Sequence, residues 1–218
     1  MKRFFQVGII RVVTSDNPEF IAQHGNIIEE NFPGIRCESK CIPDQPEGIH
    51  SRDLHTIAVP KILKVAESFT NIDMFIVSCA DDPAVEELRE RFPGIPVTGG
   101  GESTAALASK YGEKIAVLGI TDYLPPAYAR MIPEKIIACE KPRGVDSTLD
   151  LLTEKGRQSC LEKAVELKSR GAQVIALACT GLTTIGITKE LENAVGIPVI
   201  DPVLAEGTFA YFEMLRKK

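Results

Sequence analysis

The chain has 218 residues, of which 44% are hydrophobic and 25% charged, as expected of a soluble globular enzyme with one large core or two modest ones. Its net charge of −5, without a basic stripe interleaved with aromatics, argues against a nucleic-acid-binding surface. The apolar start is interrupted by Gln6 and Arg11 and precedes no small-residue cleavage site, and no apolar run could span a bilayer. We therefore expect a cytoplasmic protein that binds neither nucleic acid nor membrane.

Six cysteines raise the question of disulfides or a metal. A chain this large and apolar needs no disulfides, and Cys37 with Cys41 lacks the second pair that would complete a zinc site. His50 and His55 are five positions apart, which does not place two ligands on one helix face. We predict no metal site and interpret Cys37, Cys139 and Cys160 as small buried apolar residues.

The predicted elements alternate between strand and helix. In the first half we expect strands at 6–16, 36–43 and 75–78, and a helix at 55–68. The second half repeats this order, with strands at 114–122, 135–142 and 175–178 and a helix at 157–170 that Gly171 ends. Such alternation, with near-continuous Val and Ile runs in the strands, indicates parallel sheets covered by helices on both faces.

The two halves are most alike at residues 75–97 and 175–199. Each segment reads as an apolar strand, a cysteine, a polar turn, an amphipathic helix and then Gly-Ile-Pro-Val. The repeat predicts an α/β fold of two pseudo-symmetric lobes, each a parallel sheet flanked by helices, with the active site in the cleft between them. We expect the lobes to span residues 1–98 and 99–204.

Cys79 and Cys179 stand at equivalent positions, where a strand ends and a helix is about to begin. Ligands of open α/β sheets bind at this edge, and a helix N-terminus favours a thiolate. Inversion of a carbon needs a base on one face and an acid on the other, and a thiol with a pKa of about 8.5 can serve as either near neutral pH. We therefore predict that Cys79 and Cys179 are the opposed acid and base, with sulfurs roughly 6–8 Å apart.

Four motifs surround these cysteines. They are Cys-Ala-Asp-Asp-Pro at 79–83, Pro-Val-Thr-Gly-Gly-Gly-Glu at 96–102, Cys-Thr-Gly-Leu at 179–182, and Gly-Ile-Pro-Val-Ile-Asp at 196–201. In these motifs the chain resembles the aspartate/glutamate/hydantoin racemase superfamily, and within it hydantoin racemases most. The resemblance implies flavodoxin-like lobes and no metal or organic cofactor. It also implies that a C-terminal helix, 205–218, completes the first lobe and that the helix after Gly101 docks on the second.

The residues that follow each cysteine bear on the substrate. Glutamate racemases of the superfamily carry Asn-Thr after the first cysteine and Thr-His after the second, whereas this chain has Ala-Asp and Thr-Gly. Asp81, Asp82 and Glu102 would repel an anion, and no Lys or Arg lies within a few residues of either cysteine. We therefore expect a neutral small molecule, such as a 5-substituted hydantoin, and leave open whether the protein is a homo-oligomer.

Further substrate contacts are expected at strand ends and in the glycine-rich run. Asp82 could equally cap a helix that begins near Pro83, and Glu102 could cap a helix or contact substrate. The run 99–101 would let the backbone approach a ligand closely, and the histidines at 24, 50 and 55 are expected at the surface. The full set of candidate substrate-binding residues is Thr14, Ser78, Asp82, Gly100, Glu102, Thr121, Thr180 and Gly181.

Several alternatives stay open. The chain could racemise aspartate or glutamate, or act as a decarboxylase or cis–trans isomerase of the same superfamily, with one cysteine as proton donor or nucleophile. Relatives that decarboxylate keep one of the two cysteines, so the presence of both favours racemisation. A two-lobe binding protein without chemistry is a further possibility, which predicts ligand affinity that survives the loss of either thiol. No Gly-x-Ser-x-Gly motif supports a serine hydrolase.

Overall fold

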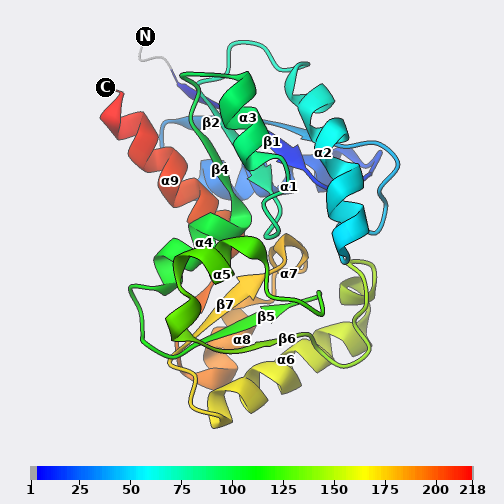
Figure 1. Ribbon diagram of the computed structural model, residues 1–218, viewed down its shortest axis with the longest axis vertical. Helices are drawn as coiled ribbons and strands as arrows, with labels where there is room; N and C mark the ends of the chain where they lie inside the picture. Colours follow the sequence, from blue (N-terminus) through cyan, green and yellow to red (C-terminus); the bar gives the residue numbers. More distant parts are fainter. Residues whose placement is uncertain (1–3, 218) are drawn as a thin grey trace.

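The computed structural model describes residues 4–217. It consists of two four-stranded parallel sheets, with helices packed on their faces (Figure 1). The first sheet has the order β2-β1-β3-β4, formed by β1 (Phe5–Arg11), β2 (Ile35–Cys41), β3 (Met74–Ser78) and β4 (Val97–Gly99). The second has the order β6-β5-β7-β8, formed by β5 (Ile115–Gly119), β6 (Ile136–Glu140), β7 (Val174–Ala178) and β8 (Val199–Ile200). The shared order confirms the predicted two-lobe α/β fold.

The sheets form because their central strands consist mainly of buried apolar residues. Every residue of β3, β5 and β7 is buried, as expected of strands that are covered on both faces. The edge strands β2 and β6 carry charged residues and are partly exposed. The register pairs Arg11 with Ser78 in the first sheet and Gly119 with Ala178 in the second, so the carboxyl ends of the central strands lie level with one another.

Most helices stay with the lobe in which they begin. They are α1 (Pro18–Asn31), α2 (Arg52–Ala66), α3 (Val85–Arg91), α5 (Pro126–Met131), α6 (Glu154–Ser169) and α8 (Thr188–Val195), with the 3-10 helices η1 (Pro133–Lys135) and η2 (Asp150–Leu152). The short helix α7 (Thr180–Thr184) follows β7 of the second sheet and contacts α1 and α9. Side chains of Asn17, Ser51 and Thr153 cap α1, α2 and α6 by accepting backbone N–H groups. Gly171, with a φ of 97°, follows α6 as predicted.

Two helices cross between the lobes. Helix α4 (Gly100–Ala108) follows β4 of the first sheet but packs against α5 and β7 of the second. Helix α9 (Pro202–Arg216) follows β8 of the second sheet and returns to α1 and β3 of the first, along one side of that lobe (Figure 1). These are the contacts expected of helices that complete the opposite lobe. Lobe boundaries near residues 98 and 204 remain our proposal.

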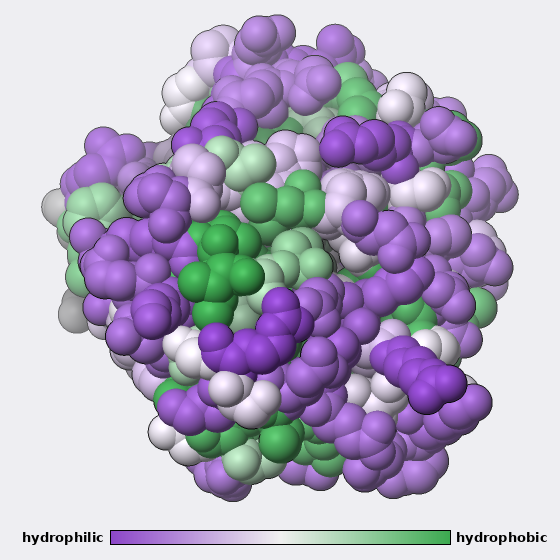
Figure 2. Space-filling model, turned by 60° about the horizontal axis from the view of Figure 1, so that its bottom comes forward, coloured by the Kyte–Doolittle hydropathy of each residue, from purple (hydrophilic) through white to green (hydrophobic). Residues whose placement is uncertain are grey.

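The surface is mainly polar. The face in Figure 2 carries a group of apolar residues near its middle, ringed by polar ones. No helix among residues 4–217 combines the length and the apolar character needed to cross a membrane.

Candidate active site

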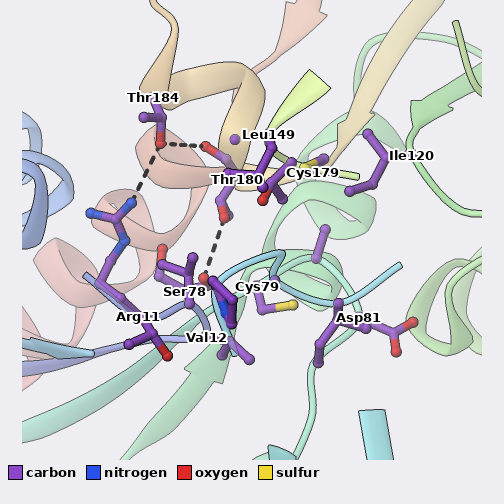
Figure 3. Close-up of a pocket in the computed structure, with 18 of the residues that line it drawn as sticks. Arg11, Val12, Ser78, Cys79, Asp81, Ile120, Leu149, Cys179, Thr180 and Thr184 are labelled. Carbon is purple, nitrogen blue, oxygen red and sulfur yellow. Dashed lines mark hydrogen bonds between the residues drawn. The ribbon is translucent and has the colours of Figure 1, made fainter. Parts of the chain in front are cut away.

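The two cysteines of the repeat line one cavity. Cys79 directly follows β3, and Cys179 directly follows β7, which occupies the same place in the second sheet. Both lie on the wall of a cavity of about 260 Å³ to which both lobes contribute (Figure 3). This is the edge at which open α/β sheets bind ligands, because the loops beyond the strand ends diverge there.

Apolar side chains form much of the cavity wall. Phe20 and Ile49 come from the first lobe, whereas Ile120, Leu149 and Leu152 come from the second. Leu149 and Leu152 are also 48% and 60% exposed to solvent, so they lie at the mouth of the cavity. A substrate therefore meets a mostly apolar enclosure with polar groups concentrated near the thiols.

Both thiols are held in their neutral form by their surroundings. Burial raises the pKa of Cys179 to about 11, although hydrogen bonds from the backbone N–H groups of Gly181 and Leu182 act in the opposite direction. Burial also raises the pKa of Cys79 well above its usual range, and the charges of Asp81 and Cys179 add to this effect. Since the charge of one thiolate opposes ionisation of the other, the pair favours one thiol beside one thiolate over two thiolates.

The threonines predicted to bind substrate line the cavity, but their hydroxyl protons are already engaged. The Thr14 hydroxyl donates to the carbonyl of Ile42 at 2.8 Å and accepts from the N–H of Gln45 at 2.7 Å. Thr121 and Thr180 donate to backbone carbonyls at 2.7 and 3.3 Å. These hydroxyls can therefore only accept hydrogen bonds from a ligand. They would bind the N–H groups of a substrate rather than its oxygen atoms.

Ser78 and Gly181 also line the cavity, each in a constrained setting. The Ser78 hydroxyl lies 2.8 Å from Nδ1 of His24 and 2.9 Å from Oε2 of Glu206, both of which are buried. It therefore faces the protein interior rather than a ligand. A Cβ atom at Gly181 would lie 3.2 Å from the Cys179 sulfur, so a glycine here leaves that thiol uncrowded.

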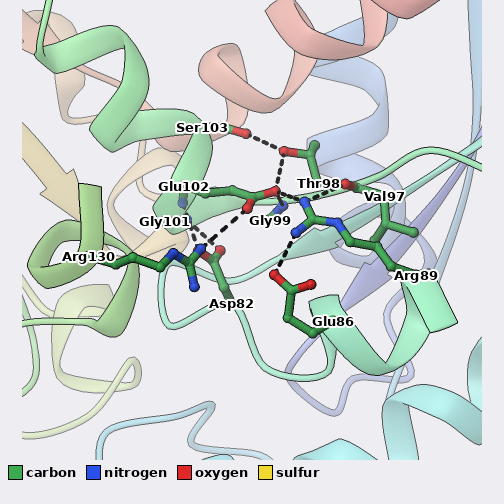
Figure 4. Close-up of polar contacts among 10 residues, drawn as sticks. All are labelled: Asp82, Glu86, Arg89, Val97, Thr98, Gly99, Gly101, Glu102, Ser103 and Arg130. Carbon is green, nitrogen blue, oxygen red and sulfur yellow. Dashed lines mark hydrogen bonds and ion pairs between the residues drawn. The ribbon is translucent and has the colours of Figure 1, made fainter. Parts of the chain in front are cut away.

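Asp82, Gly100 and Glu102 were predicted to contact substrate, but the structure does not bring them to the cavity wall. Both carboxylate oxygens of Asp82 accept hydrogen bonds, at 2.7 Å, from the N–H groups of Gly101 and Glu102 at the start of α4 (Figure 4). Asp82 thus caps α4, and the expectation that it caps a helix near Pro83 is wrong, since α3 has no side-chain cap. The cap comes from a distant segment because Gly99, at the N-cap position, has no side chain to offer.

Glu102 and the glycine run hold the same junction together. Glu102 pairs with Arg89 of the first lobe and, at 3.7 Å, with Arg130 of the second (Figure 4). A Cβ atom at Gly99 would lie 2.1 Å from Oδ1 of Asp82, and one at Gly101 would lie 2.3 Å from the Ala80 carbonyl oxygen. The glycines therefore allow close approach to the loop after Cys79, and not to a ligand as predicted.

Asp81 lines the cavity, although the sequence analysis did not place it among the substrate-binding residues. Its side chain is buried, and its Oδ2 accepts hydrogen bonds from Nδ1 of His55 and, at 3.1 Å, from the Tyr123 hydroxyl. Within the described part of the chain, its Oδ1 has no hydrogen-bond partner. Positive φ values at Asp82 (51°) and Ala84 (61°) reverse the chain here, which is why the first aspartate of the pair, rather than the second, lies on the wall.

Arg11 and His24 also belong to the surroundings of the site, although they lie far from both cysteines in the sequence. Arg11 ends β1, is buried, lines the cavity and donates to the Phe20 carbonyl at 2.6 Å. Its presence revises the expectation, based on sequence neighbours alone, that no cation lies near the cysteines. The expectation that His24 is a surface residue is wrong, because it is fully buried. His55 is half-buried against Asp81, and His50 pairs with Glu47.

A metal is not indicated by the residue pattern. Across residues 4–217, no three His, Cys, Asp or Glu side chains are grouped so that they could hold a metal ion.

The fold and the cavity define a two-lobe α/β protein with one cysteine from each lobe at a shared site.

Comparison with known proteins identifies the family. Residues 22–207 match the Asp/Glu/Hydantoin racemase family, and the chain belongs to it. This is a family of racemases, which are isomerases. The chain is 25% identical over 182 residues to a hydantoin racemase of Pseudomonas sp. (strain NS671), covering 76% of this chain and 68% of that one.

Two further similarities extend this result. An uncharacterized protein of Schizosaccharomyces pombe is 30% identical over 196 residues, which cover 84% of this chain and 79% of that protein. The solved structure of an allantoin racemase from Klebsiella pneumoniae superimposes with a TM-score of 0.80 and 20% identity, over 97% of this chain and 88% of that one. This superposition shows that the chain and the allantoin racemase share a fold.

Proposed function

We propose that this protein is a cofactor-independent racemase or epimerase in which Cys79 and Cys179 exchange protons with opposite faces of one carbon. The main support is that both cysteines, at equivalent strand ends of two lobes, line a single cavity. In one direction a thiolate removes the proton and the opposing thiol delivers another. The reverse reaction exchanges their roles, so the pair needs one ionised and one neutral member in either direction.

The proposed substrate is a neutral 5-substituted hydantoin or a related compound. Its C5–H is weakly acidic because the adjacent carbonyl delocalises the carbanion, and its ring carries N–H donors. These match the acceptors of the wall, namely the oxygen lone pairs of Thr121 and Thr180. Two relatives named as hydantoin racemases and neighbours named as allantoin racemases are consistent with this class, since allantoin is a hydantoin with a ureido group at C5.

Single cysteine variants test the mechanism. We expect Cys79→Ser and Cys179→Ser each to abolish racemisation, because a serine hydroxyl keeps the shape but is far too weak an acid to form the base near neutral pH. Each variant should still exchange the C5 proton of one enantiomer with solvent, and the two variants should prefer opposite enantiomers. The measurement is loss of the C5 proton NMR signal of each pure enantiomer of 5-benzylhydantoin in deuterium oxide, corrected for the enzyme-free rate.

The same experiment separates the alternatives. Near wild-type racemisation by either variant would remove that cysteine from the mechanism. Turnover of aspartate or glutamate in place of the hydantoin would overturn the substrate assignment. Loss of carbon dioxide from an arylmalonate would favour a decarboxylase, and hydantoin binding that persists in both variants without proton exchange in the wild type would favour a binding protein.

A further inference from the structure

A buried chain of hydrogen bonds connects the two cysteine-bearing segments behind the cavity. The Ser78 hydroxyl lies 2.9 Å from Oε2 of Glu206 and 2.8 Å from Nδ1 of His24, and Nε2 of His24 lies 2.9 Å from Oγ1 of Thr184. Ser78, His24 and Glu206 are all at most 2% exposed. Ser78 immediately precedes Cys79, and Thr184 ends the short helix α7 that begins after Cys179. The imidazole therefore bridges the two lobes directly between the catalytic segments.

Other first-lobe groups also form hydrogen bonds with Thr184. The Gln23 side-chain amide donates to its carbonyl at 2.9 Å, and Nη2 of Arg11 donates to its hydroxyl at 3.4 Å (Figure 3). In the opposite direction, the hydroxyl of Thr180 donates to the carbonyl of Ser78 at 3.3 Å. Helix α7 is thus attached to the first lobe at both ends, although Cys179, which precedes it, belongs to the second.

The ring of His24 is neutral where it joins Ser78 and Thr184. Burial and the nearby Arg11 guanidinium lower the pKa of His24 well below its usual value, so one ring nitrogen donates and the other accepts. Nδ1 and Nε2 take these two roles with the hydroxyls of Ser78 and Thr184, which lie 2.8 and 2.9 Å away. No proton has to be gained or lost to keep the bridge intact near neutral pH.

We propose that His24 is a positioning residue that sets the spacing of the two catalytic thiols by joining Ser78 to Thr184. The inference rests on the proposed two-thiol function. Proton transfer needs a sulfur within about 3–3.5 Å of the reacting carbon, and inversion needs both sulfurs to meet this condition around the same carbon. A loosened bridge would therefore impair inversion more than it impairs proton removal, for which one thiol suffices.

The test compares inversion with exchange that retains configuration. Thr184→Val removes the hydroxyl at nearly constant volume, and we expect it to lower kcat for inversion by about tenfold or more, with a smaller change in KM. The ratio of exchange with retention to inversion, measured in deuterium oxide by NMR together with chiral chromatography, should rise. Thr184→Ser, which keeps a hydroxyl, should bring the ratio back toward the wild-type value.

A matched control and a second variant complete the design. Thr208→Val removes an exposed hydroxyl on α9 that donates to the carbonyl of Leu204, and it should leave the ratio unchanged. His24→Phe fills the ring position without bridging, and it should raise the ratio as Thr184→Val does. Thermal unfolding of each variant identifies any that fail to fold, in which case the other bridge variant decides.

The experiment distinguishes failure of this inference from failure of the proposed function. If the folded bridge variants lose exchange and inversion in equal proportion, His24 does not set the thiol spacing, and the inference is overturned while the two-thiol function stands. If the wild-type protein neither exchanges nor inverts any 5-substituted hydantoin, the proposed function fails and this inference fails with it.

Discussion

At neutral pH few molecules of the free protein carry a thiolate, because burial raises the pKa of both cysteines, that of Cys179 to about 11. The neighbouring N–H groups of Gly181 and Leu182 reduce this effect for Cys179. Cys79 has instead the charge of Asp81 beside it, which raises its pKa further. In the free protein both thiols are therefore mostly protonated at neutral pH.

The raised pKa values of the two thiols predict a rising pH profile of activity. A base with a raised pKa is deprotonated only at higher pH, so kcat/KM should increase by about tenfold per pH unit between pH 6 and 8. The increase should continue until the pH approaches the pKa of the first thiol to ionise. Initial rates of racemisation followed by circular dichroism, with the hydroxide-catalysed background subtracted, provide the measurement. A profile that is already flat at pH 7 would contradict the thiol assignment.

Asp81 gives a second prediction at the residue scale. In Asp81→Asn the amide oxygen can still accept from His55 and Tyr123, but an NH₂ group replaces the unpartnered Oδ1. The negative charge that helps to raise the pKa of Cys79 is lost, so this thiol ionises at lower pH and kcat/KM at pH 7 should rise. Glu87→Gln, which neutralises an exposed acid on α3, is the control and should change kcat/KM little. Equal effects of both substitutions would show that the change reflects net charge and not the position of Asp81 beside Cys79.

The sequence indicates some of these residues and not others, for physical reasons. The cysteines are marked by an internal repeat, which needs no knowledge of packing. Asp81 could not be distinguished from Asp82, because the choice depends on backbone reversal in the loop. Arg11 and His24 could not be recognised, since Thr184, which they contact, lies more than 150 residues away in the sequence.

At the scale of elements, the regular apolar strands could be predicted from the sequence, whereas a helix with glycine in its middle and a break between two helices could not. All the predicted strands are present with ends shifted by a few residues, because buried Val and Ile runs dominate local preference. Helix α1 was not predicted, since Gly25 and Asn26 in its middle are poor helix formers. A glycine is nevertheless needed at position 25, because a Cβ atom there would lie only 2.9 Å from the Cβ atom of Cys37 on β2. The single helix expected after Cys179 is two helices, separated at Gly186 with a φ of 64°.

The crossing helix α9 carries a prediction about stability. It inserts Glu206 into the interior, where burial raises the pKa of this carboxyl well above its usual value and, among described residues, Oε1 has no partner. Above pH 4.5 the unfolded chain ionises at this position while the folded chain keeps its proton, so the folded state loses stability as the pH rises. Glu206→Gln cannot ionise and should remove this loss, which amounts to at most about 1.4 kcal/mol per pH unit for one proton.

The measurement is the free energy of unfolding in urea, for the wild type and Glu206→Gln, at several pH values between 4.5 and 8. The difference between the two proteins should grow with pH in favour of the variant. Parallel curves would show that Glu206 ionises alike in the folded and unfolded chains.

At the scale of the whole molecule, the cavity owes its shape to contacts that join the lobes. Glu102 pairs with an arginine from each lobe, and the bridge through His24 joins the cysteine-bearing segments. These contacts lie at two separate places, one at the start of α4 and one at the end of α7. The site is therefore a property of the assembled pair of lobes and not of either lobe alone.

The proposed chemistry depends only on groups of this chain, which gives a prediction for the whole protein. Racemase activity should survive exhaustive dialysis against a chelator, because backbone N–H groups and side chains, rather than a metal, stabilise the carbanion. Alkylation with iodoacetamide should abolish it, and a bound hydantoin should slow that loss. Activity that disappears on chelation and returns with zinc would show that the cysteines act as metal ligands.

The return of α9 to the first lobe also constrains how the protein is made. Val203, Ala210 and Met214 of this helix share a core cluster with β1 and β3, whose strands leave the ribosome long before α9 is synthesised. Until then, that face of the first sheet has an exposed apolar surface, and such surfaces are prone to aggregate. The core of the N-terminal half is therefore incomplete until α9 has been synthesised, whereas most of the second lobe can form as it emerges.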